Sequence, residues 1–103
     1  IANANNLETQ KLFEVVSTST GSCWAINNYF PVKGVGPQSP ADNNFEPGFS
    51  SSLMYKDLLL ASEIANANNL NLDLGQKVIQ KYLKMIQDMK GNLDFSAIVN
   101  EIN

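Results

Sequence analysis

Hydrophobic residues recur along this chain at three- and four-residue intervals, which is the spacing of one face of an α-helix. The spacing predicts helices over about residues 8 to 17 and 51 to 68, the second with Ser50 or Ser51 as its N-cap. It also predicts a helix over 74 to 90, capped by Asp73 and stopped by Gly91, and a short one over 95 to 101, capped by Asp94. No segment sustains an alternation with period two, so the sequence predicts an all-α domain.

Each of the two long predicted helices has one apolar face, and we expect that face to be buried. In the helix over 51 to 68 the apolar positions are Leu53, Met54, Leu58, Ala61, Ile64 and Ala65. In the helix over 74 to 90 they are Val78, Ile79, Tyr82, Leu83, Ile86 and Met89. Lys77, Lys81 and Lys84 mark the face that should meet solvent.

A proline-rich segment separates the first predicted helix from the second. All four prolines and four of the six glycines lie between residues 21 and 48. Proline fixes φ and has no backbone N–H, so neither a long helix nor a central strand can run through this segment. We expect a largely irregular loop, ordered by aromatic side chains that pack against the domain. These are Trp24, Tyr29, Phe30 and Phe45, and we expect Cys23 to pack as well.

Composition excludes several classes of function. The chain has 103 residues, a formal net charge of -3 and no histidine, so it has no strongly basic surface for nucleic acid. Without histidine it cannot assemble a Ser-His-Asp or Cys-His catalytic group, or a histidine-ligated zinc site, and we predict no metal site. Its single cysteine, Cys23, cannot form an internal disulfide, which favours a reducing, intracellular compartment. No apolar run reaches the roughly 18 residues of a membrane helix.

The heptapeptide over residues 1 to 7 recurs identically over residues 64 to 70. The residues that follow the two copies do not align without a gap, so we favour two similar helix ends, each followed by a turn, over a duplication. The first copy reads as the end of a helix that begins upstream of Ile1. We therefore interpret the chain as a fragment of a longer protein.

A series of short motifs joins the proline-rich loop to the helix that carries Lys56, and a final motif closes the chain. This series resembles the carboxy-terminal helical domain of the 3-hydroxyisobutyrate dehydrogenases, within the β-hydroxyacid dehydrogenase family. The resemblance covers essentially all of this chain and the last third of such an enzyme. The motifs are Cys23-Trp24, Tyr29-Phe30-Pro31-Val32, Gly34-Val35, Pro40-Ala41, Asn43-Asn44-Phe45, Gly48-Phe49, Leu53-Met54-Tyr55-Lys56-Asp57-Leu58 and Gly91-Asn92-Leu93-Asp94-Phe95-Ser96-Ala97.

The resemblance implies that residues 1 to 103 form a helical substrate-binding and dimerisation domain, and that the Rossmann domain is absent from this chain. It implies an NAD cofactor, with NADP possible, and the interconversion of 3-hydroxyisobutyrate and methylmalonate semialdehyde in valine catabolism. The expected partners are a small 3-hydroxy acid and further copies of the chain, with no nucleic acid and no membrane. The compartment would be the cytoplasm of a bacterium or the mitochondrial matrix of a eukaryote.

The resemblance also assigns site residues. By spacing alone, Lys56 is a solvated helix lysine, Asp57 a surface carboxylate and Phe49 an apolar staple at the helix start. In the family, the lysine of Leu-Met-x-Lys-Asp-Leu reaches the bound dinucleotide, so Lys56 is the predicted cofactor contact. Phe49 and Asp57 are predicted to line the substrate pocket. The resemblance places the family's acid/base lysine upstream of Ile1, so we predict no catalytic residue in this chain and expect it to be inactive alone.

Three departures from the family pattern bear on the substrate. Ala25 stands where the loop often carries serine, Phe30 replaces an asparagine, and Lys33 replaces a proline. Two alternatives therefore stay open. One is a sister reductase that acts on glyoxylate, succinic semialdehyde or tartronate semialdehyde. The other is a non-catalytic helical interaction module.

Overall fold

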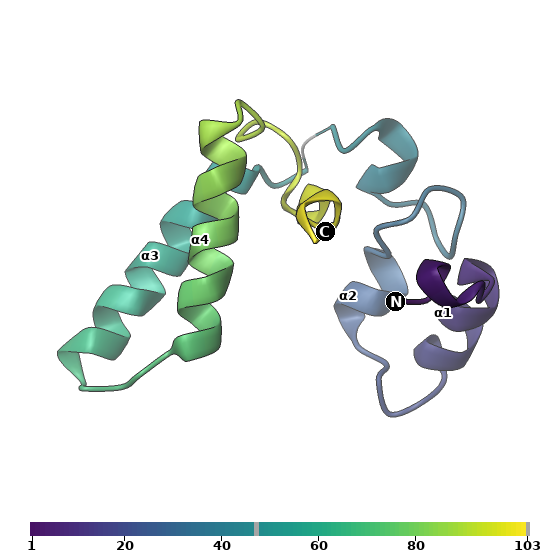
Figure 1. Cartoon of the computed structure of the whole chain (residues 1–103), viewed down its shortest axis with the longest axis horizontal. Helices are drawn as coiled ribbons and strands as arrows, with labels where there is room; N and C mark the ends of the chain where they lie inside the picture. Colours follow the sequence, from purple (N-terminus) through teal and green to yellow (C-terminus); the bar gives the residue numbers. More distant parts are fainter. Residues whose placement is uncertain (47, 103) are drawn as a thin grey trace. The chain divides into compact units, whose positions relative to one another are not determined.

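A computed structural model of the protein describes residues 1–46 and 48–102, so Pro47 of the proline-rich loop lies outside the described residues. The α-helices are α1 (Thr9–Ser17), α2 (Trp24–Asn28), α3 (Ser51–Ala67) and α4 (Asp73–Gln87), and the 3-10 helices are η1 (Asn3–Asn5), η2 (Pro40–Asn43) and η3 (Phe95–Glu101) (Figure 1). The described residues contain no strand, only an isolated antiparallel bridge between Ser50 and Asp94. The all-α prediction is confirmed. The chain divides into two compact units, Ile1–Phe45 and Glu46–Asn103.

The first unit packs α1 against α2 and orders much of the proline-rich loop. Phe30 is buried, and its ring meets that of Phe13 edge to face with centroids 5.2 Å apart. Asp42 fixes the rest of this loop, because its carboxylate accepts hydrogen bonds from the backbone N–H groups of Gly34 and Ser39, both at 2.8 Å. These hydrogen bonds lower the pKa of Asp42, that from Ser39 most strongly.

The loop differs from its prediction in two respects. It contains the short helices α2 and η2 and is therefore less irregular than expected. Phe30 anchors it as predicted, but Trp24 is 67% exposed and Cys23 is exposed, so the packing role expected for these two residues is wrong within this chain. The Trp24 ring lies beside Tyr29, with centroids 5.4 Å apart.

The second unit is built on an antiparallel pair of helices, α3 and α4 (Figure 1). The 3-10 helix η3 packs against both of them. Its core contains Met85, which is completely buried, together with Tyr82, Ile79, Ala65 and Ala97. Tyr82 keeps its hydroxyl paired in this core by donating to the backbone oxygen of Phe95 at 3.0 Å. Burial, followed by the nearby Asp94, raises the pKa of Tyr82 to about 12.

The buried faces of α3 and α4 are narrower than the apolar stripes predicted. Ser62 and Ala65 are buried on α3, whereas Leu53 is 46% and Ile64 67% exposed. On α4 the buried positions are Ile79, Tyr82 and Met85, while Val78 and Leu83 are exposed, as is Met89 just beyond the end of the helix. A two-helix pair covers only one side of each helix, so part of each wide apolar stripe faces away from its partner.

The ends of the long helices follow the prediction in part. Ser50 is the N-cap of α3, and its hydroxyl accepts a hydrogen bond from the N–H of Leu53 at 3.3 Å. Asp94 caps η3 as predicted. Asp73 was expected to cap α4, but the N-cap is Leu72 and Asp73 is the first helical residue. Asp73 still lies in the first turn, where its negative charge interacts favourably with the helix dipole and stabilises the helix.

Gly91 was also expected to stop α4, and that prediction is wrong. The chain leaves the helix through Met89, which has the left-handed φ of 61°, and the N–H of Lys90 bonds back to the oxygen of Met85 at 2.8 Å. Gly91 has a different use. A β-carbon at this position would collide with the hydroxyl of Ser52, so glycine allows the backbone after α4 to approach the start of α3.

The repeated heptapeptide adopts one local structure twice. Asn6 and Asn69 both have a left-handed φ of 55°. The following leucine N–H bonds back to the second residue of each copy, from Leu7 to Ala2 at 3.0 Å and from Leu70 to Ala65 at 2.9 Å. Each copy therefore closes a helical turn with a left-handed asparagine.

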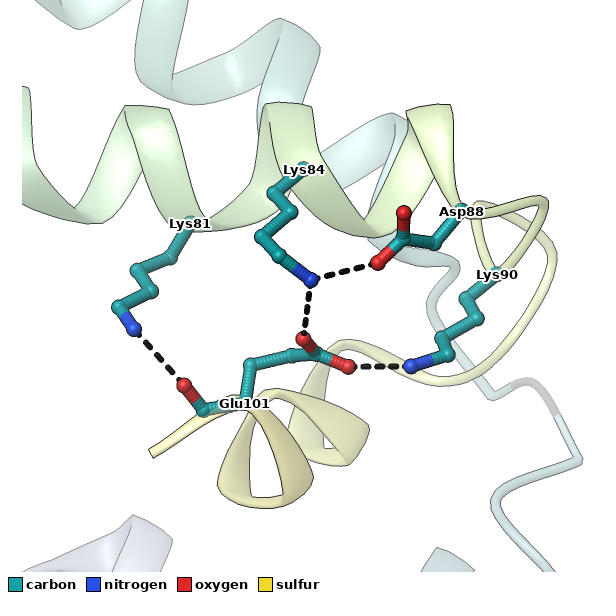
Figure 2. A network of polar contacts seen from close by, with 5 residues as sticks. All are labelled: Lys81, Lys84, Asp88, Lys90 and Glu101. Atoms are coloured by element: carbon teal, nitrogen blue, oxygen red, sulfur yellow. Dashed lines mark hydrogen bonds and ion pairs between the residues drawn. The ribbon is translucent and has the colours of Figure 1, made fainter. Parts of the chain in front are cut away.

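The end of η3 is tied to α4 by a cluster of lysines around Glu101 (Figure 2). The Glu101 carboxylate pairs with Lys90 and, at 3.2 Å, with Lys84, which also pairs with Asp88 at 2.6 Å. Lys81 donates to the backbone oxygen of Glu101 at 2.7 Å. The hydrogen bond from Lys90, and after it that from Lys84, holds the pKa of Glu101 below its ordinary value.

We expect the Glu101 cluster to make stability depend on acidity. A carboxyl whose pKa is lowered by folding stabilises the protein above its unfolded-state pKa, and this contribution is lost as the pH falls through the folded-state pKa. Thermal unfolding of wild type and Glu101→Gln should therefore differ in midpoint at neutral pH, with wild type the more stable. The difference should shrink as the pH falls below about 4.5. A constant difference from neutral to acidic pH would contradict this role.

Candidate functional site

The predicted cofactor contact, Lys56, lies in the second turn of α3 and projects into solvent, with 61% of its side chain exposed. Its ammonium pairs with the carboxylate of the next residue, Asp57, with Nζ and Oδ1 3.0 Å apart. The Asp57 side chain is itself 51% exposed. An exposed ion pair of this kind is worth only about 0 to 1 kcal/mol, so the ammonium can exchange Asp57 for another anionic partner at little cost.

Phe49, predicted to line the substrate pocket, lies immediately before the N-cap of α3 and is half-buried. Because Phe49 lies outside the helix, backbone hydrogen bonds determine the direction of its side chain. The direction of Lys56 is determined by the helix itself. The oxygen of Phe49 accepts a hydrogen bond from the N–H of Phe95 at 2.8 Å. The two rings meet at 73° with centroids 6.2 Å apart, an edge-to-face contact.

Asp94 lies behind Phe49 and is completely buried. Its Oδ2 accepts hydrogen bonds from the backbone N–H groups of Gly48 and Phe49, both at 3.1 Å. Its Oδ1 accepts from the N–H of Ser96 at 2.9 Å and from the Ser96 hydroxyl at 2.6 Å. The sequence predicts only the Ser96 part, as a helix cap. No local signal predicts the contact with Gly48 and Phe49, which joins segments far apart in the chain.

The start of α3 is held by backbone hydrogen bonds from the same segment. The N–H of Ser51 donates to the oxygen of Leu93 at 2.7 Å, and the N–H of Ser52 donates to the oxygen of Gly91 at 2.9 Å. Ser51 is fully buried, and its hydroxyl donates to the backbone oxygen of Asp94 at 3.3 Å. The first turn of α3 is thus anchored, and with it the direction in which Lys56 leaves the helix.

The groups that this site presents are suited to binding a ligand. Lys56 supplies an exposed ammonium on an anchored helix, which suits ribose or phosphate oxygens of a nucleotide. Within residues 1–46 and 48–102, no three His, Cys, Asp or Glu side chains gather in a group that could hold a metal ion. In the same residues, no helix has both the length and the apolar character needed to cross a bilayer.

Comparison with known proteins identifies the family of this all-helical chain. The family model described as "NAD-binding of NADP-dependent 3-hydroxyisobutyrate dehydrogenase" matches residues 1–102. The solved structure of Mycobacterium tuberculosis 3-hydroxyisobutyrate dehydrogenase with L-serine is 41% identical, with a TM-score of 0.92 over 99% of this chain and 35% of that one. This chain therefore belongs to the 3-hydroxyisobutyrate dehydrogenase family, of which it forms the carboxy-terminal helical domain.

Two curated relatives carry different named activities. The mitochondrial 3-hydroxyisobutyrate dehydrogenase of Drosophila melanogaster is 41% identical over 98 residues, covering 95% of this chain and 30% of the relative. The NAD-dependent L-serine dehydrogenase of Pseudomonas aeruginosa is 35% identical over 95 residues, covering 92% of this chain and 32% of the relative. The chain spans about a third of the length of the curated relatives it matches.

Proposed function

We propose that this chain is the helical part of an NAD-dependent dehydrogenase that interconverts 3-hydroxyisobutyrate and methylmalonate semialdehyde in valine catabolism. One observation carries the proposal. Lys56 and Asp57, the pair expected at the cofactor and substrate, stand on an anchored helix and are engaged there by a weak exposed ion pair with each other. The family model, which describes an NAD-binding domain, supports the cofactor.

Lys56 is the proposed cofactor contact. Its ammonium can turn from Asp57 to a ribose or phosphate oxygen, because the pair with Asp57 is exposed and therefore contributes little. Asp57 would remain within reach to orient the ammonium or a polar group of the substrate. When bound, the nicotinamide supplies hydride chemistry at the alcohol carbon of the hydroxy acid. The acid/base lysine implied by the family resemblance lies outside residues 1–103.

Phe49 is the proposed pocket residue of this domain. Its ring is half-buried against Phe95, and its backbone is held on both sides, by Asp94 at the N–H and by Phe95 at the oxygen. A fixed aromatic ring excludes water and orients a small ligand without losing many rotamers of its own. These properties suit a wall beside the methyl-bearing carbon of 3-hydroxyisobutyrate.

We propose that the enzyme is a homo-oligomer joined through this helical domain. Leu53, Leu60 and Ile64 lie at seven- and four-residue spacing on α3 and are 46%, 50% and 67% exposed. An apolar stripe of this width on one helix is typical of a face that another helix covers. A second copy of the chain presents the matching stripe.

The compartment is a separate proposal. In a eukaryotic source we would expect the mitochondrial compartment that the name of the Drosophila relative gives for that protein.

L-serine is the second candidate substrate. The Pseudomonas aeruginosa relative is named an L-serine dehydrogenase, and the Mycobacterium tuberculosis structure was solved with L-serine. L-serine and 3-hydroxyisobutyrate both carry a primary alcohol and a carboxylate on the same central carbon. They differ in whether that carbon carries an ammonium or a methyl group.

The test is a substrate series with the complete enzyme and saturating NAD. We expect kcat/KM for 3-hydroxyisobutyrate to exceed that for L-serine by about 10-fold or more, because the Phe49 ring proposed beside the central carbon packs well against a methyl group and offers an ammonium no hydrogen-bond acceptor. Glyoxylate, succinic semialdehyde and tartronate semialdehyde, assayed as reductions, complete the series. A preference for L-serine or for one of these aldehydes would replace the proposed substrate, and no turnover of any of them would contradict the proposed enzyme class.

A further inference from the structure

The buried Asp94 carboxylate is a polar group that the proposed chemistry does not use. Charged groups are rarely buried unless they are fully paired, and Asp94 is paired by four hydrogen bonds, two at each oxygen. The two at Oδ1 come from Ser96 and cap η3. The two at Oδ2 come from Gly48 and Phe49, 46 and 45 residues away in the chain.

The bonds at Oδ2 hold one particular segment. The backbone hydrogen bonds that anchor α3, from Ser51 to Leu93 and from Ser52 to Gly91, do not involve the Asp94 side chain. The carboxylate is therefore additional to the helix anchor, and it grips the two residues just before the N-cap. The backbone of Phe49 is fixed at both of its polar groups. Its N–H donates to the Asp94 carboxylate, and its oxygen accepts from the N–H of Phe95.

We propose that Asp94 is a positioning residue for the substrate pocket: its carboxylate sets the place of the Phe49 ring, while Lys56 keeps its place without it. This inference rests on the proposed function, in which Phe49 lines the pocket. Misplacing a group that orients the substrate by about 1 Å can cost on the order of 100-fold in rate. Asp94 would therefore affect turnover of the hydroxy acid through Phe49, without contacting the substrate.

The test uses Asp94→Ala in the complete enzyme, with steady-state oxidation of 3-hydroxyisobutyrate and of L-serine and with calorimetric titration of NAD. We expect kcat/KM for the better substrate to fall about 10- to 100-fold. We expect the Kd for NAD to change less than about 2-fold, because the α3 anchor and Lys56 remain in place. A general loss of stability would weaken turnover and NAD binding together, so a fall in kcat/KM with an unchanged Kd for NAD points to the position of Phe49.

Two further variants sharpen the test. Ser96→Ala is the matched control, since it removes the 2.6 Å hydrogen bond at Oδ1 and leaves Gly48 and Phe49 on Oδ2. It should keep the wild-type kcat/KM. Asp94→Asn should recover part of the activity, because its amide oxygen can accept from Gly48 and Phe49 and its NH₂ group can donate to the Ser96 hydroxyl, while the hydrogen bond from the backbone N–H of Ser96 is lost.

Amide hydrogen exchange on the wild-type enzyme tests the proposal even if Asp94→Ala does not fold. The N–H groups of Gly48 and Phe49 should be protected like those inside α3, and exchange as fast as in an exposed loop would overturn the proposal. A folded Asp94→Ala enzyme with unchanged kcat/KM, or with equal losses of kcat/KM and NAD affinity, would also overturn it. If the wild type itself turns over none of the substrates, the proposed function fails and this inference falls with it.

Discussion

Replacing Lys56 with alanine in the complete enzyme should weaken NAD binding about 10- to 150-fold, which corresponds to about 1.5 to 3 kcal/mol. This is the range of a hydrogen bond that involves a charged group. The side chain is 61% exposed and contributes little to packing, so the variant should fold normally. Calorimetric titration of NAD into the two proteins measures the change directly.

Lys77→Ala is the matched control for this prediction, because Lys77 is an exposed lysine on the neighbouring helix α4 and has no proposed role. It should leave the Kd for NAD unchanged. Lys56→Arg should restore binding only in part, since the guanidinium is larger and planar and does not reproduce the position of a compact ammonium. A well-folded Lys56→Ala enzyme with the wild-type Kd would return Lys56 to the class of ordinary solvated lysines.

Replacing Met85 with alanine should lower the free energy of unfolding of this chain by about 2 to 5 kcal/mol. Met85 lies on α4 and is completely buried in the unit in which α3, α4 and η3 pack together, so its removal leaves a cavity as well as losing buried apolar surface. Met89→Ala is the matched control, since Met89 is 88% exposed only four residues away. It should change stability by less than about 0.5 kcal/mol. Equilibrium urea unfolding of the three proteins gives the comparison, and equal effects of the two substitutions would refute the assignment of the core.

The contrast between Met85 and Met89 shows where the pattern of the sequence stops being informative. The helical period predicts α4 and most of its buried side, but a stripe that includes Val78 and Leu83 is wider than one partner helix can cover. Met89 is exposed for another reason, because the chain has left the helix there with a left-handed φ of 61°. Periodicity shows which positions share a face, but it does not show how much of that face a neighbouring helix covers or where the helix ends, and the predicted stripe therefore includes Met89 and omits Met85.

In the candidate site, too, some features can be predicted from the local sequence and others depend on tertiary contacts. Ser50 as the cap of α3 and the turn after its end follow from local chemistry, and the structure confirms both. Lys56 was singled out through the family motif, since nothing local separates it from other exposed lysines. The grip of Asp94 on Gly48 and Phe49 could not be predicted, because it depends on a tertiary contact that no spacing in the sequence encodes.

A crystal structure of the complete enzyme with NAD and 3-hydroxyisobutyrate would test the roles of Lys56 and Phe49 together. We expect Nζ of Lys56 to lie within about 3.2 Å of a ribose or phosphate oxygen of the cofactor. We also expect the Phe49 ring to lie against the substrate, with Asp57 beside Lys56 or the substrate. If NAD is bound while Lys56 remains in solvent, paired only with Asp57, Lys56 is not the cofactor contact.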